Sequence, residues 1–244
     1  MSWGVLLAAG AGLLAGGALL VGAIIAWYKD VPQNVVAGIM AFGAGVLISA
    51  LSFDLVAESL NEAGIWPTLS GFAVGAILYV GVNAFLDWRN LRNRRGREES
   101  PGTGTGIAVG ALLDGIPESM VLGLSMVGGH GVSVPVLTAV VISNLPEGLS
   151  STAELKASGK DKKFVFTLWG GIAIVAAVSS VVGYTILADA SVELTGFITA
   201  LAAGAILAMI CDTMIPDAFR RTHNYTGLLA TVGFLTSLII HELA

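Results

Sequence analysis

Eight runs of apolar residues, separated by short polar segments, constrain the fold of this chain more than any other feature. Each run has about 20 residues or more, the length that an α-helix needs to cross a bilayer. Composition agrees, because 55% of the 244 residues are hydrophobic, 12% are charged and the mean hydropathy is +0.83. We therefore predict an all-α polytopic membrane protein that forms one domain over residues 1–244. The expected spans cover residues 3–28, 34–58, 66–87, 104–128, 132–155, 164–188, 192–216 and 223–243.

The basic residues lie only in alternate connecting segments, which the predicted topology places on one side of the membrane. All 12 lysines and arginines lie in the segments that follow the first, third, fifth and seventh spans. Cytoplasmic loops are enriched in these residues, so we expect both termini outside a plasma or inner membrane. Five arginines fall in or near residues 89–103, which are expected to form an Arg-rich cytoplasmic loop suited to lipid headgroups.

The second and seventh spans resemble each other. AFGAGVLISALSFDLVAES matches ALAAGAILAMICDTMIPDA with Gly45 opposite Gly204, and Glu58 opposite Asp217 thirteen residues later. The predicted topology makes these two spans run in opposite directions across the membrane. Such an inverted pair around a central module is typical of transporters and predicts a 3+2+3 arrangement of the spans.

Four carboxylic acids are predicted to lie within the membrane. Asp114 and Glu118 fall in the fourth span, Glu147 in the fifth and Asp212 in the seventh, and no span contains Lys or Arg. An ionisable side chain in hydrocarbon costs a few kcal/mol, so such residues usually face a bundle interior or a hydrated path. Protons or an imported cation must therefore compensate these charges.

Helical spacing predicts which of these groups share a face. Asp114 and Glu118 are four residues apart, which places them on one edge of the fourth span. On the next, antiparallel span, Ser143 and Asn144 share an edge with Glu147. Together these edges predict a pocket of carboxylate, amide and hydroxyl oxygens, which are suitable ligands for a divalent cation.

Each of these two spans also contains a proline. Pro117 and Pro146 lack the backbone N–H, so we expect them to release the carbonyl oxygens of Leu113 and Ile142 and to kink both helices. Free carbonyls at this depth would add further oxygen ligands to the pocket.

The motifs DGIPES (114–119) and SNLPEG (143–148) resemble the paired fourth- and fifth-span motifs of the ZIP (Zrt/Irt-like protein) metal transporters, commonly written HNxPEG. The seventh span, LAAGAILAMICDTMIPDA, also resembles its counterpart in that family. The resemblance covers essentially the whole chain, and it identifies a divergent, bacterial-type member. The residues that match the motif directly are Pro117, Glu118, Pro146, Glu147 and Gly148.

The resemblance implies a site for two metal ions bridged by Glu147. A first ion would be bound by Asp114, Glu118 and Glu147. A second would be bound by Asn144, Glu147 and Asp212. The chain departs from the family where Asp114 and Ser143 replace the motif histidines, and where Gly115 removes a ligand of the second ion.

The predicted function is transport of divalent metal cations toward the cytoplasm, with Zn²⁺, Mn²⁺ or Fe²⁺ as the substrate. No organic cofactor, enzymatic activity or nucleic-acid partner is expected. The family resemblance also suggests a homodimer in the membrane. Asp54 and Glu58, at the outer end of the second span, are secondary candidates for a cation entrance.

Three other functions remain open from the sequence. One is a carrier of a non-metal substrate in which the acids relay protons. Another is a transport-inactive structural or sensing homologue, since the motif histidines are lost. An intramembrane enzyme is the third, although no nucleophile–base pair or oxyanion donor accompanies the acids.

Overall fold

A computed structural model describes residues 3–93, 104–127, 131–187 and 189–243 of the chain. Part of the predicted Arg-rich loop, residues 94–103, lies outside these ranges. The remainder of it is helical, because the helix of the third span continues to Asn93. The first half of the structure contains α1 (Trp3–Tyr28), α2 (Gln33–Ala50), the π-helical segment η1 (Leu51–Val56), α3 (Ala57–Ala63) and α4 (Ile65–Asn93).

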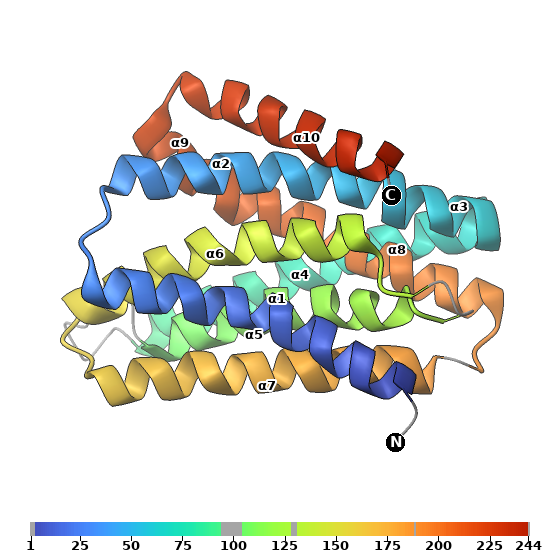
Figure 1. Cartoon of the computed structure of the whole chain (residues 1–244), viewed down its shortest axis with the longest axis horizontal. Helices are drawn as coiled ribbons and strands as arrows, with labels where there is room; N and C mark the ends of the chain where they lie inside the picture. Colours follow the sequence, from blue (N-terminus) through green and yellow to red (C-terminus); the bar gives the residue numbers. More distant parts are fainter. Residues whose placement is uncertain (1–2, 94–103, 128–130, 188, 244) are drawn as a thin grey trace.

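The second half has the same kind of construction. It contains α5 (Gly104–Leu124), α6 (Val134–Ala157), α7 (Lys162–Ile186), α8 (Val192–Met209), the π-helical segment η3 (Ile210–Met214), α9 (Ile215–Thr222) and α10 (Tyr225–Leu243). Because α2–η1–α3 and α8–η3–α9 are each continuous, the described helices form eight rods that lie roughly along one axis (Figure 1). The predicted all-α architecture is confirmed.

Six of the described rods are long and apolar enough to cross a membrane, which confirms a polytopic membrane protein. The rods α5 and α6, which contain the two proline motifs, are not among the six. Both are strongly engaged with other helices: α5 packs on α7 and α8, and α6 packs on α1 and α2. The six rods are Trp3–Tyr28, Gln33–Ala63, Ile65–Phe85, Lys162–Ile186, Val192–Thr222 and Tyr225–Leu243.

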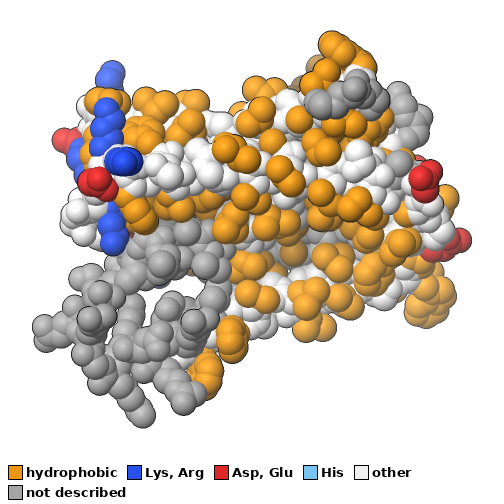
Figure 2. Space-filling view, turned by 90° about the horizontal axis from the view of Figure 1, so that it is seen from below, with side chains coloured by type: hydrophobic (Ala, Val, Ile, Leu, Met, Phe, Trp, Pro, Cys, Tyr) orange, Lys and Arg blue, Asp and Glu red, His pale blue; other side chains and the backbone are white. Residues whose placement is uncertain are grey.

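Charged and apolar side chains are segregated along the rods. In the space-filling view, lysines and arginines gather at one end while apolar side chains cover the middle (Figure 2). We call this the basic end, and the opposite end, where both termini lie in Figure 1, the termini end. The described cations of the basic end are Lys29, Lys156, Lys160, Lys162, Lys163, Arg220 and Arg221.

Local signals explain where several rods begin. The hydroxyl of Ser133 accepts a hydrogen bond from the backbone N–H of Val136 at 3.4 Å, and Pro135 follows in the first turn of α6. Asp161 and Ser191 cap α7 and α8 in the same way. These caps satisfy backbone N–H groups that have no partner within the helix.

Several helix pairs approach each other through glycine, and α2–α10 and α4–α8 are two of them. A Cβ on Gly45 of α2 would lie 1.8 Å from the carbonyl oxygen of Ala230 in α10. Similarly, a Cβ on Gly204 of α8 would lie 2.0 Å from the carbonyl oxygen of Phe72 in α4. Only glycine permits these distances, so backbone meets backbone at both contacts.

Each pair contains a second contact of the same kind, in which the glycine comes from the other helix. Gly233 of α10 lies against Phe42 of α2, and a Cβ there would be 2.0 Å from its carbonyl oxygen. Gly75 of α4 lies against Leu201 of α8, with a corresponding distance of 1.9 Å. The pairs α2–α10 and α4–α8 are therefore built by the same device.

Candidate functional site

A polar cavity of about 200 Å³ extends from the middle of the bundle toward the basic end. Three of the predicted site residues line it: Asp114 from α5, and Ser143 and Glu147 from α6. One residue of the first proline motif and two of the second therefore meet in this cavity. The other polar residues of its lining are Tyr79, Asn83, Ser150, Ser151, Glu154, Thr213 and Asp217.

Glu118 lies beside this cavity rather than in it. Its side chain is 2% exposed, and its Oε2 atom has no hydrogen-bond partner. The cavity that it does line has a volume of only about 10 Å³, which is about the space for one water molecule. Apart from Glu118, the lining is entirely apolar: Leu47, Ala50, Leu51, Leu55, Val121, Val136, Ala139, Val140 and Ile206.

Two polar side chains of α6 are committed to backbone hydrogen bonds. The amide nitrogen of Asn144 donates to the carbonyl oxygen of Ala15 in α1 at 2.9 Å. The hydroxyl of Ser143 donates to the carbonyl oxygen of Val140 at 3.0 Å, within its own helix. Both residues are buried, so these bonds satisfy groups that would be costly to leave alone. Asn144 thus ties α6 to α1 in this conformation.

Asp212 is exposed and does not line the cavity. It lies in η3, next to the exposed Cys211. A π-helical turn contains one more residue than an α-helical turn, so it changes which residues face the interior. Within the same segment, Thr213 faces the cavity instead.

The carboxyls interact electrostatically without forming a ready-made ligand set. Glu118 is close enough to Glu147 and Asp114 for their charges to interact, and the charges of Asp114 and Glu147 also interact with each other. Among the described residues, however, no group of three His, Cys, Asp or Glu side chains could hold one metal ion. Charges interact over longer distances than coordination bonds span. The carboxyls can therefore affect one another without being close enough to bind one ion together.

The two prolines do not interrupt their helices. The helices α5 and α6 continue on both sides of Pro117 and Pro146, so the chain is not unwound there. The irregular backbone lies instead in η1 and η3, on the neighbouring rods. Such π-helical turns often occur at functional sites. The sequence analysis did not predict them.

Tyr79 is a site residue that the sequence analysis missed. It lies in α4, is 7% exposed, and lines the cavity together with Asp114. Thr213 of η3 lines the same cavity, so both polar neighbours of the phenol come from other rods. A lone tyrosine in the middle of an apolar span was the available signal, because a buried tyrosine hydroxyl needs a polar partner.

A second polar cavity, of about 210 Å³, lies toward the termini end. Glu58, one of the two secondary candidates, lines it together with Glu62, Ser59 and Ser125. The apolar shell of Glu118 lies between this cavity and the one at the basic end, since Leu55 and Val121 belong to both the shell and the cavity lining.

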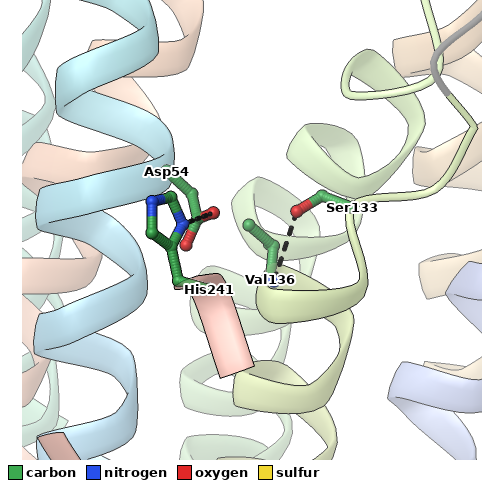
Figure 3. Close-up of polar contacts among 4 residues, drawn as sticks. All are labelled: Asp54, Ser133, Val136 and His241. Carbon is green, nitrogen blue, oxygen red and sulfur yellow. Dashed lines mark hydrogen bonds and ion pairs between the residues drawn. The ribbon is translucent and has the colours of Figure 1, made fainter. Parts of the chain in front are cut away.

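Asp54, the other secondary candidate, does not line the cavity at the termini end. Its Oδ1 atom lies 2.9 Å from Nδ1 of His241, as Figure 3 shows. The two side chains are 11% and 33% exposed, and Oδ2 of Asp54 has no hydrogen-bond partner. Asp54 therefore joins η1 to the last turn of α10 in this conformation.

The fold and the site together define an all-helical, polytopic membrane protein with buried carboxylates between two cavities. The chain is 28% identical over 181 residues to the "Putative zinc transporter" of Arabidopsis thaliana. That alignment covers 72% of this chain, which spans only 29% of the length of the relative. No protein-family model matches the chain. The chain is thus a distant homologue of this plant protein, which confirms the resemblance to ZIP transporters.

Proposed function

We propose that the protein transports divalent metal cations across a membrane through the carboxylate site between α5 and α6. The observation that carries this proposal is the meeting of Asp114 and Glu147 in one polar cavity. They come from two Pro-Glu motifs on adjacent rods, and no basic residue occurs in either span. Carboxylate oxygens without a protein cation are suited to bind an imported one.

The two cavities support a transport mechanism rather than a static binding site. One reaches the carboxylates from the basic end, and the other begins at the termini end beside Glu58. The apolar shell around Glu118 separates them. This is the arrangement expected of a carrier that is open on one side only. If the basic end faces the cytoplasm, as the positive-inside rule predicts, this conformation is open to the cytoplasm and metal moves toward it.

The reciprocal glycine contacts within the pairs α2–α10 and α4–α8 support the inverted repeat. The register that pairs Gly45 with Gly204 also pairs Leu51, where η1 begins, with Ile210, where η3 begins. Gly45 packs on α10 while Gly204 packs on α4. In this proposal, each of the two π-interrupted rods is paired with a rod of equivalent origin, and the α5–α6 site lies between them.

The proposed first ion is bound by Asp114, Glu118 and Glu147. Glu118 must approach the other two carboxyls for this, so we expect its apolar shell to open when metal binds. The proposed second ion, bound by Asn144, Glu147 and Asp212, needs larger changes because Asn144 is bonded to α1 and Asp212 is exposed. Zn²⁺, Mn²⁺ and Fe²⁺ are the candidate substrates, and the zinc transport named for the plant relative supports the first. A homodimer in the plasma or inner membrane is the proposed assembly.

Uptake by purified protein in liposomes tests this function. We expect Glu147→Gln and Asp114→Asn to abolish saturable zinc and manganese uptake, while Glu242→Gln and Asp189→Asn, both at exposed residues, retain it. Metal analysis of the same purified proteins should show a matching loss of bound metal. Normal uptake by Glu147→Gln would contradict the proposed site.

One observation favours a second function. Glu118 is enclosed by apolar side chains, a setting in which a carboxyl is more easily kept neutral than charged. A carrier that relays protons for a non-metal substrate would use such a residue. Proton flux in metal-free liposomes that is lost in Glu118→Gln would support this alternative, and a strict requirement for metal would exclude it.

A further inference from the structure

A further cavity, of about 330 Å³, lies at the basic end, where the ends of α1, α2 and α6 meet. Both α1 and α2 pack on α6, which lies between them in Figure 1. Among the described residues, this cavity shares none of its lining with the cavity of Asp114 and Glu147. It is therefore a separate feature, which the proposed transport path does not use.

The lining of this cavity is divided into an apolar part and a polar part. Ala26, Val36 and Leu149 are buried and form a small hydrophobic cluster. The polar residues are all exposed at the end of the bundle, and they are Lys29, Asp30, Gln33 and Lys156. An apolar base beneath a rim with two lysines is suited to a molecule that has an anionic head and an apolar tail.

The ammonium group of Lys156 is held at the rim by α1. Its Nζ atom donates a hydrogen bond to the carbonyl oxygen of Trp27 at 3.3 Å and lies 3.6 Å from Oδ1 of Asp30. The carboxylate of Asp30 is fully exposed, so this ion pair contributes little and is readily exchanged for another anion. Because an ammonium group has three protons, Lys156 can donate to a further acceptor without leaving Trp27.

The first turn of α2 adds positive potential on the other side of the cavity. Its N-cap residue is Pro32, no described side chain caps it, and its first turn contains no acidic residue. The first N–H groups of a helix have no partner within the helix, and they favour an anion. Gln33, the first residue of α2, lines the cavity, so these groups lie beside the lysine rim.

The cavity also lies at the level of the membrane surface. Trp27 and the exposed Tyr28 end the apolar helix α1, and such aromatic residues are enriched at the membrane–water interface. Lys162 of α7 hydrogen-bonds to the Tyr28 hydroxyl and lies over its ring, with Nζ 4.9 Å from the centroid. The positive-inside rule predicts that this end faces the cytoplasm, where the membrane leaflet is rich in anionic lipid.

We infer that this cavity binds an anionic phospholipid, with the phosphate between Lys29, Lys156 and the first turn of α2. Part of an acyl chain covers the apolar base. The lipid thereby connects α1 and α6 to α2, whose helix ends line the cavity without closing it. Binding of lipid at this place is independent of the substrate that the protein transports.

Native mass spectrometry of the purified, delipidated protein with added phosphatidylglycerol tests this site. In the double variant Lys29→Gln, Lys156→Gln, we expect the Kd for phosphatidylglycerol to rise by about tenfold or more, because two cations leave the cavity. Binding of zwitterionic phosphatidylcholine should not change. The matched control is Lys160→Gln, Lys163→Gln, which removes the same charge from the same end at residues outside the described lining. It should keep the natural Kd within about twofold.

A gain in affinity separates this site from damage to the fold. Asp30→Asn removes the carboxylate that competes for Lys156, so phosphatidylglycerol should bind a few fold more tightly. Equal losses of affinity in the two double variants would mean that the overall charge of the basic end attracts lipid, and the inference would be wrong. Inorganic phosphate that binds as tightly as phosphatidylglycerol would also overturn it, because the apolar base would then contribute nothing.

Discussion

The rods α2–η1–α3 and α8–η3–α9 share a plan but serve opposite ends of the molecule. Each is a long apolar helix interrupted by a π-helical segment, and each packs through glycine on a neighbouring helix. They run in opposite directions along the bundle (Figure 1). In η3, Thr213 lines the cavity that leads from the carboxylates to the basic end. In η1, Asp54 is bonded to His241 and does not line the cavity at the termini end.

The register of the proposed repeat makes this difference more specific. It pairs Asp54 with Thr213, and the register that pairs Gly75 with Gly233 also pairs Asn83 with His241. Thr213 and Asn83 line the same cavity, whereas Asp54 and His241 are bonded to each other. Phe53 packs edge-on against Phe234 beside them. Equivalent positions are thus open at one end and closed at the other, as expected for a carrier in one of its two end states.

The largest expected effect should come from disrupting the glycine contacts that both rods make. Gly45→Val and Gly204→Val should each destabilise the protein by about 3 kcal/mol or more, because a side chain has no room beside the facing carbonyl. We expect most of both variants to be lost before purification. Thermal unfolding in detergent, followed by size-exclusion chromatography, measures the remainder.

The matched control for the glycine variants is Gly17→Val in α1, where a Cβ would meet no atom within 4 Å. It should be purified in normal yield. If Gly45→Val is severely impaired and Gly204→Val is not, the two contacts are not equivalent and the proposed repeat loses its main support.

The next largest effect should be a difference in stability between variants at η1 and at η3. His241→Ala removes the hydrogen-bond partner of Asp54, a mostly buried carboxyl, so we expect a loss of about 1–3 kcal/mol in the free energy of unfolding. Thr213→Val should cost less, because it loses one bond from a hydroxyl to the carbonyl of its own helix. Unfolding in detergent, followed by tryptophan fluorescence, compares the two. An equal loss in both variants would show that η3 is as tightly held as η1.

Chemical labelling should show which end is open. Cys211 is the only cysteine of the chain, so Cys211→Ala gives a background without thiols. In that background, Ser151→Cys, in the cavity that opens to the basic end, should react roughly tenfold faster with a membrane-impermeant thiol reagent than Val140→Cys, in the apolar shell. Zinc should slow the reaction at position 151. Equal rates at both positions would mean that the shell does not separate the cavities.

The smallest expected effect concerns the metal. Oxygen ligands suit manganese and magnesium, whereas imidazole suits zinc and other transition metals. Asp114→His, which restores the residue of the ZIP motif, should therefore widen a modest preference for zinc over manganese by a few fold. Competition uptake with both ions measures this. A strong zinc preference that Asp114→His leaves unchanged would mean that Asp114 does not contact the ion.

Helical periodicity and hydropathy were sufficient to predict much of this molecule. The eight apolar runs correspond to eight described rods, although the hydropathy of only six is by itself diagnostic of a span. Spacing within a helix relates Asp114 to Glu118, four residues apart, although these two side chains line different cavities. The meeting of Asp114 and Glu147 also depends on how α5 and α6 pack. Both lie in regular helices that the prolines do not interrupt.

The predictions that the structure does not match involve irregular backbone or distant partners. Asp212 was assigned to the second ion from the family resemblance, but in η3 it is exposed, and Thr213 lines the cavity. Asn144 is bonded to Ala15, 129 positions away in sequence, and Tyr79 lines the cavity of Asp114 from another rod. No local pattern specifies such contacts, because they depend on how complete rods pack. Spacing within one helix predicts which residues share a face, but it does not predict which other helix packs on that face.

The glycine contacts also have a consequence for the order of events during synthesis. The face of α2 that contains Gly45 packs on α10, the last described helix, whereas α4 packs on α8. The early rod α2 therefore enters the membrane long before its glycine partner leaves the ribosome. Until then, lipid or a chaperone must cover this narrow face, whose backbone groups are already satisfied within the helix. The helix α10 thus completes the packing of a face that α2 exposes early in synthesis, and a fragment without α10 cannot form this contact.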